Sequence, residues 1–290
     1  MANDKFAEVT DKMKTRIAYM PLTTYPETIS DESVLAAVGF VASLGCALHA
    51  TTFAVRIPQI YSPWGNLLVD VPGLVRTAEE RSKTECRRLQ DLVRGAASSH
   101  FKVECRTREI VLGAALDMAA AEARYFDLSV LPWSGATLAV KDMTEAVVFG
   151  SGRAAILVPP SARPATLDHI AIAWDASQVA ARALGDALPL LADGGRISVL
   201  TVEDEKPLSG SDIAESLATA LEKRGVSAKP FSISLRGRTI SEALQESALL
   251  EGAQVLAMGG FGHSRVRDFV LGGATKGVLN QLLLPTLLSH

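Results

Sequence analysis

The sequence has little of what marks secreted, membrane-spanning or nucleic-acid-coating proteins. Its three cysteines form no Cys-x-x-Cys pair, which argues against a disulfide framework and a cysteine zinc site. No apolar run approaches the roughly 20 residues of a membrane span, and the polar start has no signal-peptide core. A net charge of −3 argues against a protein that coats nucleic acid. We therefore expect a cytoplasmic protein with reduced, buried thiols and no metal site.

The second half of the chain alternates short β-rich apolar runs with amphipathic segments. This alternation predicts parallel strands joined by crossover helices, which form a doubly wound sheet that binds ligands at the carboxyl ends of its strands. The expected strands cover 169–174, 196–202, 226–235, 253–259 and 283–289, and the expected helices cover 177–195, 211–225, 239–252 and 273–282.

The first half repeats this order, and a proline-rich linker at 159–166 separates the two. The expected strands cover 16–21, 46–55, 100–108, 127–132 and 154–159, and the expected helices cover 30–45, 73–99 and 110–125. We predict an α/β fold with two tandem, doubly wound, open parallel five-stranded sheets of Rossmann-like type. The predicted domains are 1–160 and 166–290.

A glycine-rich segment, MGGFGHSRVRDFVLGGATKGVL, follows the strand at 253–259 and invites three chemical interpretations. A phosphate loop of the P-loop type fails, because GGATKG has the wrong spacing. The stretch GSGRAA at 150–155 matches a dinucleotide fingerprint but precedes a strand instead of opening a helix. A serine hydrolase built on Ser264 fits four of five elbow positions, but Val266 stands where a small residue is needed.

The third interpretation is a mononucleotide site made of backbone amides. Gly259, Gly262 and Gly272 form the pattern G-x2-G-x9-G. Gly272 and Gly273 would open a helix whose free N–H groups suit a phosphate. His263, Ser264 and Arg265 can add donors from the intervening loop.

This pattern, with GHSR after the second glycine, resembles the nucleotide motif of ATP-binding universal stress proteins. The likeness extends over nearly the whole chain, which therefore resembles a tandem member of that family and, by this resemblance, has a fold of the adenine nucleotide alpha hydrolase-like type. By this resemblance, Asp175 at the end of the first strand of the second half faces the adenosine and Val202 lies near the adenine. The family places Ser or Thr after the third glycine, where this chain has Gly273, and Thr275 is the substitute hydroxyl.

The resemblance implies a stress-response protein that binds ATP, ADP or AMP, with or without Mg²⁺, in its C-terminal domain. The nucleotide would act as a conformational or partner-binding switch, with no catalytic residues assigned and at most slow ATP hydrolysis. It also implies that the two domains pair through their last strands as a pseudo-dimer, which can itself form a homodimer.

The first half has lost most of this pattern. We expect Leu22 to stand where Asp175 does, and Pro132 to replace Gly259. Gly135 matches Gly262, but the next glycine, in Gly150-Ser151, comes too late in the chain. A proline has no N–H and a leucine cannot bind a ribose hydroxyl, so we expect no nucleotide here. Two alternatives stay open: Asp175 can be a simple helix cap or turn residue, and both halves can be interaction modules without nucleotide.

Overall fold

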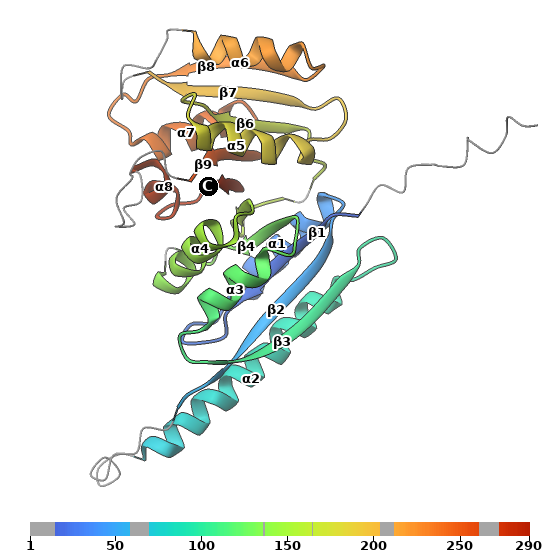
Figure 1. Cartoon of the computed structure of the whole chain (residues 1–290), viewed down its shortest axis with the longest axis vertical. Helices are drawn as coiled ribbons and strands as arrows, with labels where there is room; N and C mark the ends of the chain where they lie inside the picture. The colour runs from blue at the N-terminus through green and yellow to red at the C-terminus, as the bar shows by residue number, and fades with distance from the viewer. Residues whose placement is uncertain (1–14, 59–69, 136, 164, 204–211, 261–272) are drawn as a thin grey trace, which may run out of the picture.

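The computed structural model describes residues 15–58, 70–135, 137–163, 165–203, 212–260 and 273–290, and the fold is reported for these (Figure 1). The strands are β1 Ile17–Leu22, β2 Ala47–Arg56, β3 Val103–Val111, β4 Leu128–Pro132, β5 Ala155–Val158, β6 His169–Ala173, β7 Arg196–Val202, β8 Ser227–Ile233, β9 Val255–Gly259 and β10 Thr286–Ser289. The helices are α1 Asp31–Ser43, α2 Val71–Gly95, α3 Ala115–Ala123, α4 Leu138–Ser151, α5 Gln178–Ala187, α6 Ile213–Glu222, α7 Ile240–Leu250 and α8 Gly273–Val278.

The ten strands form one continuous sheet in the order β3-β2-β1-β4-β5-β10-β9-β6-β7-β8. Each half has the doubly wound order and is parallel throughout, as the alternating pattern predicts. The halves join where β5 and β10 pair antiparallel, with Leu287 opposite Ile156. The expected pairing of the last strands within one chain is thus confirmed, and it lays the two halves end to end (Figure 1).

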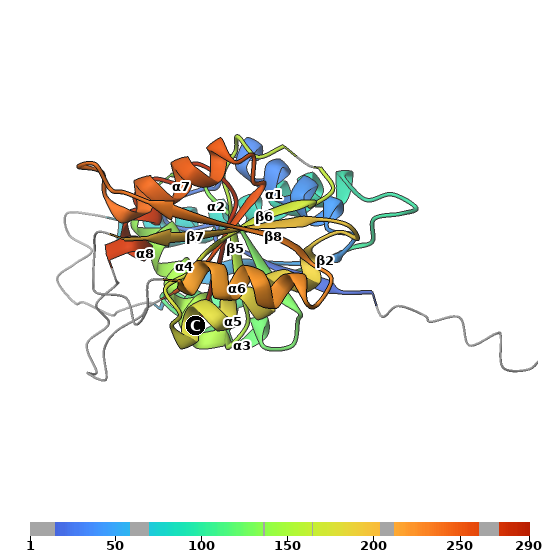
Figure 2. The same ribbon diagram turned by 90° about the horizontal axis from the view of Figure 1, so that it is seen from above.

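Two groups of buried apolar side chains cover the two faces of this sheet. One packs beneath α1, α2, α5 and α6, and the other beneath α3, α4, α7 and α8. The view from above shows helices on both sides of the sheet (Figure 2). Strands buried on both faces must be apolar at nearly every position, which explains the continuous apolar runs of β1 and β9.

Several elements differ from the sequence-based expectation. The helix expected from residue 110 begins at Ala115, because Ile110 and Val111 continue the β3 ladder against β2. The helix expected to end at 195 stops at Ala187, and a 3₁₀ turn containing Pro189 follows it. Helix α4, capped by Thr137, was not expected from the sequence, since its apolar residues do not stand out from those of β5.

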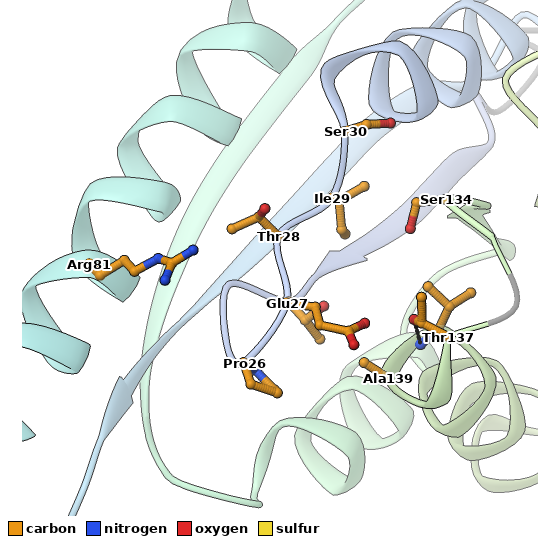
Figure 3. A pocket seen from close by; sticks show the side chains of 11 residues that line it. Pro26, Glu27, Thr28, Ile29, Ser30, Arg81, Ser134, Thr137 and Ala139 are labelled. Carbon is orange, nitrogen blue, oxygen red and sulfur yellow. Dashed lines mark hydrogen bonds between the residues drawn. The ribbon is translucent and has the colours of Figure 1, made fainter.

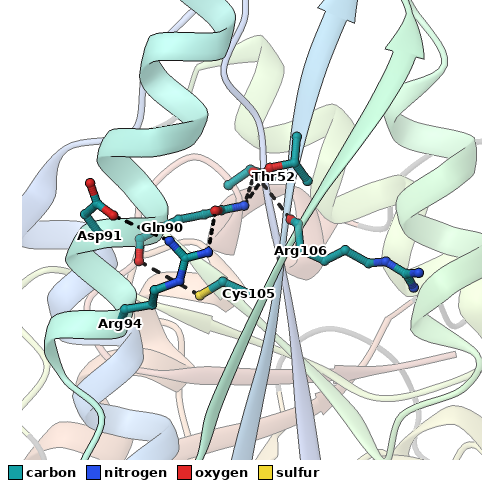
Figure 4. Close-up of polar contacts among 7 residues, drawn as sticks. Thr52, Gln90, Asp91, Arg94, Cys105 and Arg106 are labelled. Atoms are coloured by element: carbon teal, nitrogen blue, oxygen red, sulfur yellow. Dashed lines mark hydrogen bonds and ion pairs between the residues drawn. The ribbon is translucent and has the colours of Figure 1, made fainter.

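Helix α2 is held on the outer strands of the first half by a polar network (Figure 4). The amide of Gln90 donates to Thr52 Oγ1 at 3.0 Å and to Thr107 Oγ1 at 2.6 Å. Arg94 donates in turn to Gln90 Oε1 at 2.8 Å. Gln90 is buried, and a buried amide needs such partners. The network fixes how α2 lies along β2 and β3.

His169 links β6 to β7 inside the second half and gives folding a dependence on pH. Its ring is buried, and Nε2 lies 2.8 Å from Ser198 Oγ. Burial first, and then the charge of Arg196, lower the pKa of His169. Above about pH 6.5 the ring is neutral in both folded and unfolded chains. Below that, the unfolded chain binds a proton that the folded chain resists, so stability falls as pH falls towards the lowered pKa.

Replacing His169 with glutamine keeps a hydrogen-bonding amide but removes this titration. Between pH 7.5 and 5.5, we expect urea unfolding to show a smaller loss of stability in His169→Gln than in the parent chain. The free energy of unfolding that the parent chain loses beyond His169→Gln changes by at most about 1.4 kcal/mol per pH unit, the value for one proton. His100→Gln, at an exposed histidine, is the control and should follow the parent. Equal losses in all three proteins would contradict the assignment.

Candidate functional site

The sheet order places a switch point in each half, where neighbouring strands lead to helices on opposite faces. In the second half this point lies between β6 and β9, which pair in parallel from Ile170 and Val255. In the first half it lies between β1 and β4. Because β5 and β10 run antiparallel, the carboxyl ends of the two sets of strands point to opposite edges of the sheet. The chain therefore has two separate candidate sites of the type that binds ligands in this fold.

Asp175 lies just beyond β6, at the carboxyl edge of the second half. Its Oδ1 accepts a hydrogen bond from the Ser177 amide at 3.0 Å, and the side chain is exposed. Ser177, not Asp175, caps α5. Asp175 thus holds a turn through Oδ1 and does not cap the helix, and its role toward an adenosine stays a prediction.

Gly259 ends β9 beside the start of α5, in a position with no room for a side chain. A Cβ there would lie 2.6 Å from Val179 Cγ2 and 2.9 Å from the Val179 carbonyl carbon. Close packing of α5 on β9 is therefore sufficient to explain why this residue is glycine. The next residue, Gly260, donates its amide to Ser289 O at 2.7 Å, which carries the chain over the end of β10.

Helix α8 begins at Gly273 and contains a second glycine, Gly277, near its end, and the surroundings of the two glycines differ. Among the described residues, a Cβ on Gly273 would meet nothing within 4 Å, whereas one on Gly277 would clash with Ser241 Oγ in α7. Gly277 is thus a packing residue, and no described residue fills the space beside Gly273. Thr275 is buried at 3% exposure, and Gly273 is exposed.

Val202 ends β7, next to β6, and is half-buried against the apolar group beneath α7 and α8. It lies at the same carboxyl edge as Asp175 because β6 and β7 are parallel. Five other predicted site residues lie outside the described residues: Gly262, His263, Ser264, Arg265 and Gly272. The hydrolase interpretation depends on one of them, Ser264.

Matching hydrogen bonds establish which residues of the two halves are equivalent. The Ile17 amide donates to the Asp127 carboxylate as the His169 amide donates to the Gln254 side chain. The strand registers agree, since Ala18 pairs with Leu128 as Ile170 pairs with Val255.

The counterpart of Asp175 is therefore Thr23, and the expectation of Leu22 is wrong. Leu22 is fully buried, and it matches Trp174 one position earlier in the second half. The sequence comparison missed this because both first strands are apolar at almost every position, so their pattern does not fix the register.

The structure agrees that the first half has no counterpart of the third glycine. Gly150 and Ser151 lie in the last turn of α4, where a Cβ on Gly150 would meet Ala120 Cβ at 2.8 Å. The start of that helix is instead capped by Thr137, close after Gly135 in the chain. The first half thus has no long glycine loop between β4 and α4.

None of the three thiols is activated as a nucleophile. Cys46 and Cys86 are buried and Cys105 is half-buried, and burial raises the pKa of all three thiols. A protonated thiol is a poor nucleophile. Among the described residues, no group of His, Cys, Asp and Glu could hold a metal ion. No helix in those parts is both long and apolar enough to cross a membrane.

Comparison with solved structures gives the class of this fold. The chain is similar to a universal stress protein from Archaeoglobus fulgidus, with a TM-score of 0.65 and 16% identity, over 93% of this chain and 97% of that one. It is similar to a universal stress protein from Pseudomonas aeruginosa, with a TM-score of 0.54 and 14% identity, over 95% and 93%. A functionally unknown protein from Pseudomonas aeruginosa matches with a TM-score of 0.52 and 14% identity, over 94% and 92%.

These matches span both halves, so the chain has the fold of tandem universal stress proteins, as the sequence resemblance implied. No family model matches the sequence, and no curated protein sequence does either.

Proposed function

We propose that the second half binds an adenine nucleotide at the carboxyl edge of β6 and β9, and that the chain acts as a stress-response protein switched by this ligand. The observation that carries the proposal is the placement of Asp175 and Gly259 at the carboxyl ends of the paired strands β6 and β9, with α8 beginning at Gly273. Ligands bind at such points in doubly wound sheets.

Each residue has a role that its chemistry suits. Asp175 keeps Oδ2 as an acceptor for a ribose hydroxyl, since its turn engages Oδ1. Val202 provides an apolar wall for the adenine. Gly262 and Gly272, with His263, Ser264 and Arg265, would supply amide and side-chain donors for the phosphates of ATP, ADP or AMP, with or without Mg²⁺. Thr275 is the first residue with a hydroxyl after Gly272, the third glycine of the motif, but its side chain is buried. Gly273 is therefore the better position at which to add a hydroxyl.

Titration calorimetry with ATP, with and without Mg²⁺, tests the site. We expect Asp175→Ala and Gly262→Val each to weaken ATP binding about tenfold or more, the effect of losing a hydrogen bond to a charged group or blocking the amide loop. Thr23→Ala, the equivalent change in the first half, is the matched control and should leave ATP affinity unchanged. A parent chain that binds no ATP would overturn the proposal and favour an interaction module without nucleotide.

Gly273→Ser is expected to strengthen ATP binding by about tenfold, because it adds a hydroxyl at the start of α8 where the backbone leaves space. Gly273→Ala fills the same space without a hydroxyl and should give no gain. The difference in ATP affinity between these two variants, measured by the same calorimetry, isolates the hydroxyl. Equal affinities for the serine and alanine variants would contradict a phosphate at this end of α8.

A further inference from the structure

The first half has a cavity of about 440 Å³ at its own switch point, beyond the carboxyl ends of β1 and β4. Thr23, the counterpart of Asp175, lines it together with Ser30, Ser134 and Thr137, the last at the start of α4 (Figure 3). This volume falls within the range of small-molecule sites. The half that has lost the nucleotide pattern has therefore kept a ligand-sized space.

The connection between β1 and α1 is longer than its counterpart between β6 and α5, and it forms one wall of this cavity. In the second half, Ala176 alone separates Asp175 from the capping Ser177, whereas residues 24–29 separate Thr23 from the capping Ser30. Residues 26–29 of this added segment line the cavity. The segment is thus a feature of the first half alone, and the nucleotide pattern does not account for it.

Buried contacts hold the added segment at both ends. Thr24 donates to Phe53 O at 2.6 Å and lies 2.7 Å from Ser82 Oγ in α2. At the other end, Arg88 of α2 donates to Ile29 O at 2.9 Å. Thr24 and Ile29 are buried. The wall is therefore formed before any ligand arrives, which reduces the entropy lost on binding.

Two opposite charges stand at different sides of the cavity. Arg81 reaches from α2 toward Thr28, and Glu27 turns toward Thr137 (Figure 3). Both side chains are exposed at the mouth, and within the described part of the chain neither makes a hydrogen bond or an ion pair. A molecule that enters the cavity meets a cation on one side and an anion on the other.

We propose that this cavity binds a small zwitterion, an aminocarboxylate such as a free amino acid, separately from any nucleotide in the second half. Its carboxylate pairs with Arg81 and its ammonium with Glu27, while the hydroxyls of Ser134 and Thr137 add hydrogen bonds. Ile29 and Val140 provide apolar surface for the remainder of the molecule. Glu27 disfavours a phosphate group near α4, and Pro132 has no amide to offer one.

Thermal shift measurements with the twenty standard L-amino acids and β-alanine, each added to the full chain, identify the probe. The best stabiliser is then titrated by calorimetry. We expect its affinity to fall about tenfold or more in both Arg81→Met and Glu27→Gln. Arg87→Met, at an exposed arginine of the same helix that does not line the cavity, is the matched control and should bind as the parent does.

Chemical variants of the probe test the orientation. The N-acetyl and methyl ester forms, which each lack one charge, should bind the parent weakly. Glu27→Gln should lose its discrimination against the N-acetyl form, and Arg81→Met against the ester. Asp175→Ala should leave amino acid binding unchanged, which separates this site from the nucleotide site. Failure of all probes to stabilise the parent chain, or equal loss in Arg87→Met, would overturn the proposal.

Discussion

Replacing Leu287 with alanine is expected to lower the free energy of unfolding by about 2–5 kcal/mol, the usual cost of truncating a buried leucine. Leu287 is fully buried in β10, between Ile156 of β5 and Ala257 of β9. This position joins the two halves of the sheet. We therefore expect Leu287→Ala to lower the stability of the first half as well as that of the second.

Tryptophan fluorescence during urea unfolding can follow the halves separately. Trp133 follows β4 in the first half and Trp174 follows β6 in the second. With Trp64 and one of these replaced by phenylalanine, the remaining tryptophan reports on its own half. Both signals should shift together in Leu287→Ala, while Leu250→Ala, at 84% exposure, should change stability by less than about 0.5 kcal/mol. A shift confined to Trp174 would mean that the halves unfold independently.

Gly259→Ala is expected to destabilise the chain by about 1–3 kcal/mol, a typical cost of overpacking. The added methyl group would lie 2.6 Å from Val179 Cγ2 and 2.9 Å from the Val179 carbonyl carbon, so α5 would have to move away from β9. Urea unfolding measures this cost without any ligand, which separates it from a role in nucleotide binding.

Two further variants test the cause of that loss. Gly259→Ala combined with Val179→Ala should recover part of the stability, because the contact with Val179 Cγ2 disappears while those with Val179 Cβ, at 2.8 Å, and with the backbone remain. Gly273→Ala is the control within the same glycine segment: its methyl group meets none of the described residues within 4 Å, so stability should stay the same or rise by up to about 1 kcal/mol. Equal losses at Gly259 and Gly273 would rule out packing as the cause.

The positions of Asp175 and Gly259 near strand ends followed from the sequence, because the apolar pattern marks where those strands end. Asp175 and Gly259 each fall within two residues of the end of a strand. What the pattern did not reveal is why Gly259 is glycine, since its contact with Val179 joins segments far apart in the chain. Part of a motif that resembles a ligand loop is thus a packing requirement.

The sequence by itself determined the α/β alternation and the duplication, and the family resemblance implied the pairing of the last strands. Apolar periodicity and turn residues are local properties, and a repeated order of strands implies a repeated fold. Only the tertiary structure decided the register of β1 against β4, and with it that Thr23 matches Asp175. Strands buried on both faces are apolar throughout, so their sequence carries no mark of register. The cavity at Thr23 depends in turn on contacts from α2, a helix distant in sequence, which no local pattern encodes.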